Sequence, residues 1–112
     1  MTGAPVNLVE LGPDDAGEEH FVTLVESANV KIERIVSSGQ ASPAGFWYDQ
    51  PWAEWVMVLA GSAGLRFDGE AEIMVLRAGD HVLIPARQKH RVEWTDASRA
   101  TVWLAVHYAE SG

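Results

Sequence analysis

Cysteine is absent from this chain. Disulfide bonds and thiolate metal sites are therefore excluded, and any bound metal ion must take nitrogen or oxygen ligands. Basic residues are also scarce, with 8 Lys and Arg against 16 Asp and Glu and a formal net charge of -8. Nucleic-acid binding relies on a basic surface, so this balance predicts that nucleic acid is not a partner.

Long apolar runs are missing as well. The longest, residues 55–60, is far shorter than the roughly 20 residues that a membrane-spanning helix needs. Residues 1–5 do not show the basic segment and apolar stretch that begin a secretory signal. These absences predict a soluble, cytoplasmic protein without a membrane partner.

The size and the apolar pattern indicate one all-β domain. A chain of 112 residues is large enough for one core and too short for two, and we predict a single domain over 1–112 with its core at about 7–108. Period-two alternation recurs, whereas a sustained helical stripe does not. The predicted strands are 21–26, 30–36, 46–50, 54–59, 64–68, 71–77, 81–85, 90–95 and 101–108. So many short strands predict a sandwich or barrel.

Two spaced sets of residues carry the most specific signal. Glu54 is followed after six residues by Gly61, and Gly79 is followed after five residues by Pro85 and then by His90. These spacings resemble the two motifs of the cupin family, in particular its small single-domain members. The resemblance implies a double-stranded β-helix, or jelly-roll barrel, with an internal cavity.

The chain departs from the cupin pattern at the leading glycine of the first motif, which is not aligned, and at four further positions. Tyr48 and Gln50 stand where the paired histidines of the first motif are expected. In the second motif, Arg87 replaces a glycine and Trp94 replaces the terminal asparagine. The resemblance therefore predicts the fold more firmly than the chemistry.

The resemblance also implies a metal site. Tyr48 and Gln50 are two residues apart and share one face of a predicted strand. By similarity to cupins, Glu54 and His90 point into the same end of the barrel, so the implied ligands of a divalent ion (Zn, Fe, Mn or Ni) are Gln50, Glu54, His90 and Tyr48. An amide is a weak ligand, and a phenol has an ordinary pKa near 10. Alternatively, Glu54 and His90 form a buried pair without a metal.

Other side chains are candidates for ligand binding or proton transfer. If His90 faces inward, strand alternation predicts that Trp94 does so too. The predicted ligand-binding residues are Trp47, Tyr48, Gln50 and Trp94. Tyr48 and His107 are the candidates for moving protons, and the alternative is that Tyr48 is a wall residue and His107 is structural.

Two further features suggest contacts outside the cavity: the strand face opposite Glu54, and a group of basic residues. Trp55, Met57 and Leu59 share that opposite face, which predicts either a homodimer or coverage by an N-terminal strand. The only basic cluster is formed by Arg87, Lys89 and Arg91. This cluster either attracts an anionic substrate or forms a solvated outer face.

Two functions remain compatible with the sequence. The first is a metal-dependent cupin that acts on an unidentified oxygen-rich small molecule. The alternative is a metal-free cupin module that binds a small molecule without catalysis. Motifs for a serine nucleophile, a phosphate loop or a dinucleotide are not found, and the sequence does not decide whether the chain is an enzyme.

Overall fold

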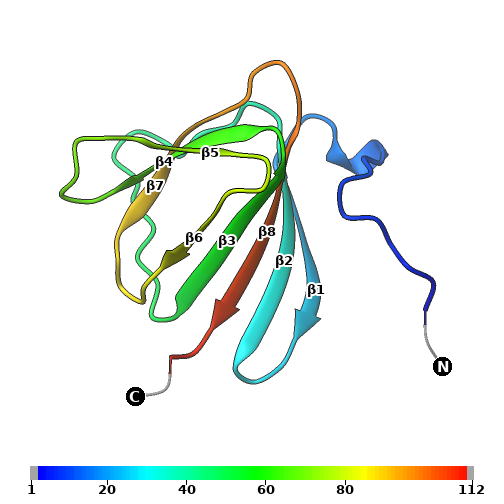
Figure 1. Ribbon diagram of the computed structural model, residues 1–112, viewed down its shortest axis with the longest axis horizontal. Helices are drawn as coiled ribbons and strands as arrows, with labels where there is room; N and C mark the ends of the chain where they lie inside the picture. Colours follow the sequence, from blue (N-terminus) through cyan, green and yellow to red (C-terminus); the bar gives the residue numbers. More distant parts are fainter. Residues whose placement is uncertain (1–2, 111–112) are drawn as a thin grey trace.

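The computed structural model describes residues 3–110, which form eight strands and one short 3-10 helix (Figure 1). The elements are η1 Pro13–Asp15, β1 His20–Glu26, β2 Val30–Ser37, β3 Ala53–Ala60, β4 Ser62–Phe67, β5 Met74–Arg77, β6 His81–Ile84, β7 His90–Thr95 and β8 Thr101–Tyr108. The predicted all-β class is confirmed. Within this range no helix is long and apolar enough to cross a membrane. The predicted limits 1–112 include two residues at each end that lie outside the described range.

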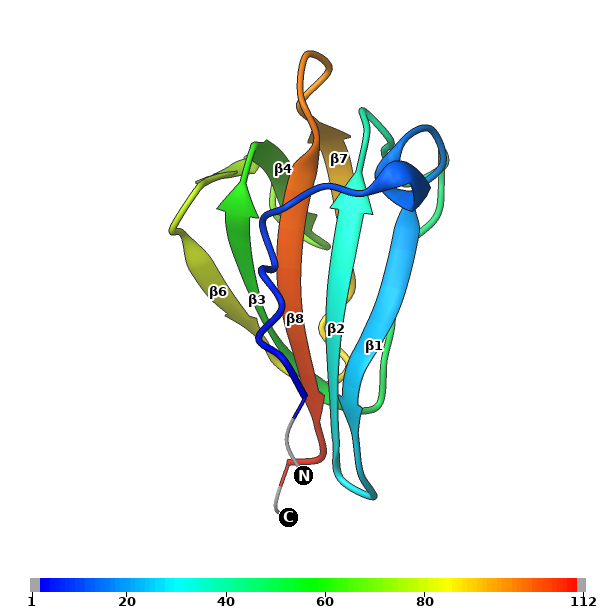
Figure 2. The same ribbon diagram turned by 90° about the vertical axis from the view of Figure 1, so that its right-hand side faces the viewer.

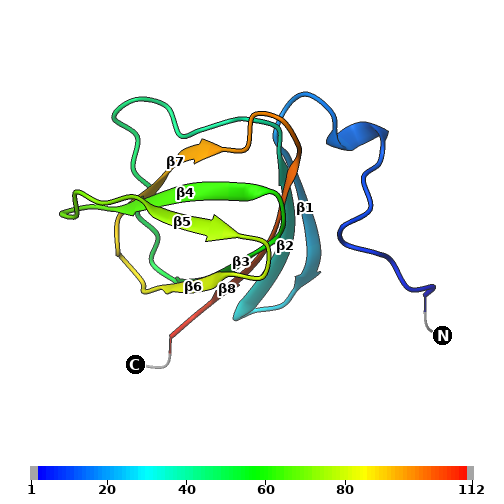
Figure 3. The same ribbon diagram turned by 45° about the horizontal axis from the view of Figure 1, so that its top comes forward.

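The strands form two sheets that face each other as a jelly-roll barrel (Figure 3). The larger sheet has the order β1-β2-β8-β3-β6, and the smaller has the order β5-β4-β7. Strand β8 is central, because it pairs along its whole length with β2 and, on its other side, with β3. Strands β1 and β2 follow each other in the chain and pair antiparallel as a hairpin.

The core lies between the two sheets and follows strand alternation. Val56 and Val58 are buried on the same face of β3 as Glu54. They pack with residues from β4, β5, β6 and β8, namely Ala63, Leu65, Leu76, Ile84, Trp103 and Ala105. One interior face thus carries both the apolar core and, at the start of β3, a buried carboxylate.

The predicted strand at 46–50 is wrong. This segment contributes only one isolated bridge, between Tyr48 and His90. The physical reason is that nearby backbone carbonyls bond a side chain instead of a strand: the Arg91 guanidinium donates to the carbonyl oxygens of Ser42, Pro43 and Phe46. The segment is therefore a loop anchored to β7.

The N-terminal segment crosses the outer face of the larger sheet (Figure 2). Arg34 of β2 holds it there, because its guanidinium donates to the carbonyl oxygens of Leu8 and Glu10. The same guanidinium lies 3.0 Å from the buried carboxylate of Asp15. The segment is attached mainly by charge and hydrogen bonds, since its side chains Val6, Val9 and Leu11 are exposed.

Asp15 is the centre of this attachment. The Arg34 guanidinium, followed by the backbone N–H of Gly12, holds the pKa of Asp15 far below its ordinary value. His20 lies 3.1 Å from the same carboxylate. Because the folded state favours the ionised form, Asp15 stabilises the protein above the ordinary carboxyl range, and this contribution is lost as the pH falls through and below that range.

We expect Asp15→Asn to lower the free energy of unfolding at pH 7 by about 1–3 kcal/mol, because buried donors lose their acceptor. The difference from wild type should be smaller at about pH 2.5 than at pH 7, since the wild-type contribution is lost only as the pH falls below the ordinary carboxyl pKa of 3.8. Urea unfolding at both pH values measures this. Asp14→Asn, at the exposed neighbouring position of η1, is the control and should change little; an equal loss in both variants would contradict the role of Asp15.

Candidate functional site

A cavity of about 550 Å³ opens between the two sheets. Val56, Leu65 and Ile84 of the core form part of its wall. The wall also contains Tyr48, Gln50, Glu54, His90 and His107. The structure therefore brings together, in one cavity, all four predicted metal ligands and both candidates for proton transfer.

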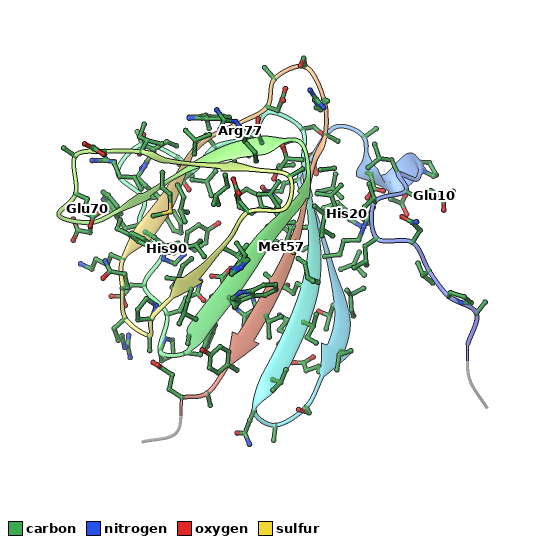
Figure 4. The ribbon with its side chains drawn as sticks, in the orientation of Figure 1. Glu10, His20, Met57, Glu70, Arg77 and His90 are labelled. Carbon is green, nitrogen blue, oxygen red and sulfur yellow. The ribbon has the colours of Figure 1, made fainter. Side chains whose placement is uncertain are left out.

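Tyr48 and His90 face each other across the isolated bridge. The backbone N–H of Tyr48 donates to the carbonyl of His90 at 2.7 Å, and the reverse bond is 3.1 Å long. Their rings stack with centroids 5.2 Å apart, and His90 lies beside β7, on the side toward β6 (Figure 4). The backbone pairing thus fixes both rings against the same wall.

His90 and Glu54 form the buried acid–base pair of the site. Their residues are only 5% and 9% exposed. Nδ1 of His90 lies 2.9 Å from the carbonyl oxygen of Gln88 and donates to it, because a carbonyl can only accept. Nε2 then faces Glu54 Oε1 at 3.7 Å, which is beyond hydrogen-bond distance. The two groups therefore face each other without a hydrogen bond between them.

Gln50 adds an unpaired polar atom to this wall. Its backbone carbonyl accepts from the N–H of Arg87 at 2.7 Å, which fixes the end of the loop. Its side-chain Oε1 is buried, and no hydrogen-bond donor within residues 3–110 reaches it. Most buried polar atoms in folded proteins have a partner, so this oxygen is a candidate contact for a bound group.

Comparisons with known proteins agree with this architecture. The family model described as Cupin domain matches residues 34–107. This chain belongs to the cupin domain family. A comparison with curated proteins finds no match.

Three solved structures show the range of similarity. A protein of Ralstonia eutropha JMP134, whose name proposes mannose-6-phosphate isomerase activity, is 50% identical over 96% of this chain and 100% of that chain, with a TM-score of 0.90. A Streptococcus pyogenes protein of unknown function is 20% identical over 100% and 92%, with a TM-score of 0.74. An RmlC-like cupin of Methanocaldococcus jannaschii with a double-stranded β-helix fold is 19% identical over 96% and 94%, with a TM-score of 0.70.

The second cupin motif keeps its backbone shape despite a substitution. Arg87, at the position where the motif has glycine, has a φ of 66°. This left-handed conformation is natural for glycine and strained for other residues. The retained conformation directs the Arg87 N–H to Gln50, so the turn still positions a residue of the cavity.

The side chains offer one imidazole, one carboxylate and one amide oxygen to a metal ion. Two ligands at about 2.1 Å from one ion lie at most about 4.2 Å apart, and the 3.7 Å separation of Glu54 and His90 fits that limit. Within residues 3–110, however, no three His, Asp or Glu side chains gather as a metal cluster. The donor set therefore fits a divalent ion, but with fewer strong ligands than a histidine-rich cupin site.

Tyr48 suits hydrogen bonding better than metal ligation. Burial, and then the negative charges of Glu19, Glu54 and Glu33, raise the pKa of Tyr48 above its ordinary value of 10.0. The hydroxyl is consequently protonated at neutral pH and can donate a hydrogen bond. To act as a phenolate ligand, Tyr48 would have to lose its proton despite its burial and these negative charges.

His107 enters the cavity but is bonded at both ring nitrogens. Trp52 Nε1 donates to Nδ1 at 3.0 Å, and Nε2 lies 2.9 Å from the Glu33 carboxylate. Because an indole nitrogen only donates, the ring proton is on Nε2 and donates to Glu33. In this arrangement His107 is a structural link between a loop and two strands and has no free nitrogen to accept a proton.

Two predicted cavity residues lie elsewhere. Trp94 is not part of the cavity wall, because a register shift in the pairing of β4 with β7 changes the alternation after Val92. Its ring packs over Gly64, where an added Cβ would lie only 2.2 Å from Trp94 Nε1. Trp47 is outside the wall too, with the guanidiniums of Arg66 and Arg91 at 5.0 and 5.8 Å from its ring centroid.

Sequence reasoning missed several residues of the cavity wall. They include Glu19, Phe21, Glu33 and Trp52. Glu33 had a readable signal, because it shares a face of β2 with Ile35, which packs against the core. Glu19 and Trp52 lie outside the strands, so no alternation indicated their direction.

We expect the two cavity histidines to carry their protons on opposite nitrogens. At about pH 8.5, where an ordinary imidazole is neutral, long-range proton–nitrogen NMR correlations should place the proton of His90 on Nδ1 and that of His107 on Nε2. His81 is a matched control outside the cavity, because its Nδ1 accepts from Trp55 at 3.1 Å. A proton on Nε2 of His90 would remove the free nitrogen from the candidate site.

Proposed function

We propose that this cupin binds a divalent metal ion (Zn, Fe, Mn or Ni) through Gln50, Glu54 and His90 and acts on a small oxygen-rich molecule in the same cavity. The supporting observation is the buried pair of Glu54 and His90 at 3.7 Å, unbonded to each other. The buried, unpaired oxygen of Gln50 lines the same cavity. A cation bound by all three side chains would give a partner to each of their unpaired polar atoms.

Each residue of this site has a defined task in the proposal. A bound divalent ion would polarise an oxygen of the small molecule. Nε2 of His90 and the Glu54 carboxylate would hold the ion, while the bond from His90 to Gln88 keeps that nitrogen free of a proton. The protonated hydroxyl of Tyr48 orients the bound molecule by donating a hydrogen bond. Val56, Leu65 and Ile84 limit water at the apolar end.

A metal-free binding module is the second candidate. The observation that favours it is the shortage of strong ligands, since residues 3–110 contain no group of three His, Asp or Glu. In that case Gln50, Glu54 and His90 would bond directly to a polar ligand, and Tyr48 would form part of its wall. Trp47 and Trp94, which were predicted to bind the ligand, would then act only by supporting the loop and β7 that carry them.

The relative from Ralstonia eutropha suggests one substrate class. Its name proposes activity on mannose 6-phosphate, which is an oxygen-rich small molecule. At 50% identity over nearly the whole chain, sugars and sugar phosphates are reasonable first compounds to test. Fold similarity alone does not define a substrate, so the choice between sugars and sugar phosphates depends on the residues that line the cavity.

We expect Zn²⁺ to bind wild-type protein and to be lost in Glu54→Gln and His90→Ala, because each substitution removes a strong ligand. Metal content after equilibrium dialysis, measured by inductively coupled plasma mass spectrometry, is the test. His81→Ala is the matched histidine control, since His81 is exposed and lies outside the cavity wall. Wild-type protein that binds no Zn, Fe, Mn or Ni would favour the metal-free module.

The same assay tests the assignment of Gln50. Gln50→His replaces an amide oxygen with an imidazole, a stronger ligand for these ions, and should tighten Zn²⁺ binding by about tenfold or more. Asp49→His, on the neighbouring exposed side chain, serves as the control. Tighter binding in the control alone would show that the first motif has a different register.

A homodimer and a cytoplasmic location remain predictions. Trp55, Met57 and Leu59 are partly buried on the outer face, and Leu83, which pairs with Trp55, is 51% exposed. We expect analytical ultracentrifugation to give a dimer mass that Leu83→Glu reduces to a monomer mass. A wild-type monomer would mean that the N-terminal segment covers this face sufficiently.

A further inference from the structure

The cavity wall is strongly acidic. Four carboxylates line it, from Glu19, Glu26, Glu33 and Glu54, together with one lysine, Lys31. Glu54 belongs to the proposed metal site, whereas the other three lie on the β1–β2 side. We call Glu19, Glu26 and Glu33 the carboxylate wall. Both sides of the cavity therefore present negative charge to any molecule that enters.

The single lysine does not offset this charge. Lys31 Nζ lies 3.5 Å from Glu33 Oε2, and its side chain is substantially exposed. Glu33 is also bonded to His107. Among the described residues Glu19 has a single, neutral partner, because its Oε2 accepts from the Ser37 hydroxyl at 2.6 Å. A phosphate in this cavity would find no uncommitted cation among the lining residues.

The basic cluster near the second motif is directed elsewhere. The Arg91 guanidinium donates to loop carbonyls and pairs with Glu93. Arg87 lies 3.6 Å from the exposed carboxylate of Asp49. Arg87, Lys89 and Arg91 are all absent from the cavity wall. The anion-attracting role considered for this cluster thus has no support inside the cavity.

From this arrangement we infer that the cavity selects a small organic cation, such as an amino sugar or another hydroxylated amine, and excludes phosphorylated sugars. Glu19 is the specificity residue, because its carboxylate is anchored by one neutral donor, the Ser37 hydroxyl, and has no cationic partner within residues 3–110. Its anchor is rigid: the buried Ser37 hydroxyl that bonds Glu19 accepts in turn from Trp103 Nε1 at 3.1 Å.

The neighbouring aromatic side chains fit the same class of ligand. Phe21, Tyr48 and Trp52 line the cavity with the carboxylates, and aromatic faces attract organic cations. The inference rests on the proposed function only in taking this cavity as the binding site. It does not require a metal ion, since the carboxylate wall is separate from Gln50, Glu54 and His90.

Because the chain lacks cysteine, one introduced thiol can report the charge preference directly. Phe21→Cys, at the half-exposed rim of the cavity, is reacted with trimethylammonioethyl methanethiosulfonate, a cation, and with sulfonatoethyl methanethiosulfonate, an anion. Ala44→Cys, in an exposed turn outside the cavity, corrects for the different intrinsic rates of the reagents. EDTA is present so that no divalent ion contributes. Ala28→Cys, also on the cavity wall, is a second reporter if Phe21→Cys is unstable.

We expect the ratio of cation to anion rates at Phe21→Cys to exceed that at Ala44→Cys by at least about tenfold, as clefts lined by one charge enhance encounter rates. Adding Glu19→Gln should reduce this excess severalfold, and raised salt should reduce it further. Equal ratios at the two positions, or faster reaction with the anion in the cavity, would overturn the inference.

Binding of matched sugars separates this inference from the metal proposal. In NMR titrations, D-mannosamine should shift cavity resonances at lower concentration than D-mannose, and D-mannose 6-phosphate should bind weakest. Glu19→Gln should bring mannosamine to the level of mannose. Tighter binding of the phosphate would overturn the inference while leaving Zn²⁺ binding intact; cation preference in protein that binds no metal would support the inference and reject the metal site.

Discussion

Pairing of β8 with both of its neighbours is the interaction on which the site depends. Because β8 is bonded to β2 and β3 along its length, side chains on the inner face of all three strands are held in fixed rows. Along β8 that face changes from Trp103 and Ala105, which pack in the core, to His107, which is bonded to Glu33. The same backbone ladder therefore builds an apolar end and a polar end of one interior.

Polar groups in such an interior have to be paired, and their pairing determines their chemistry. His107 has donor and acceptor partners and is used as a link. Within residues 3–110, His90 has a hydrogen-bond partner on Nδ1 only, so Nε2 remains directed at Glu54. Two histidines in one cavity thus have different capacities, and the difference arises from their neighbours Trp52 and Gln88 rather than from burial.

Alternation was sufficient to predict most of the fold and part of the site. The burial of Val56 and Val58 beside Glu54 follows from period two, and the spacing of Glu54 and His90 indicated the family. Alternation failed where the backbone departs from a regular ladder, as at the register shift before Trp94 and in the loop at 46–50. The bonds that define His107 join residues 55 and 74 positions apart, and local sequence carries no signal for such partners.

The substitutions in the first cupin motif change the strength of the site more than its charge. A neutral histidine carries no charge, and neither does a protonated tyrosine or a glutamine, so Tyr48 and Gln50 do not change the charge of the site. Glu54 is the carboxylate among the four predicted ligands. Weaker donors lower the affinity for a cation. Glu19 and Glu33 act in the opposite direction, because their field, which also disfavours the phenolate of Tyr48, attracts any positive charge in the cavity. An acidic wall can therefore partly offset the loss of imidazole ligands, and the same wall opposes the entry of a phosphate.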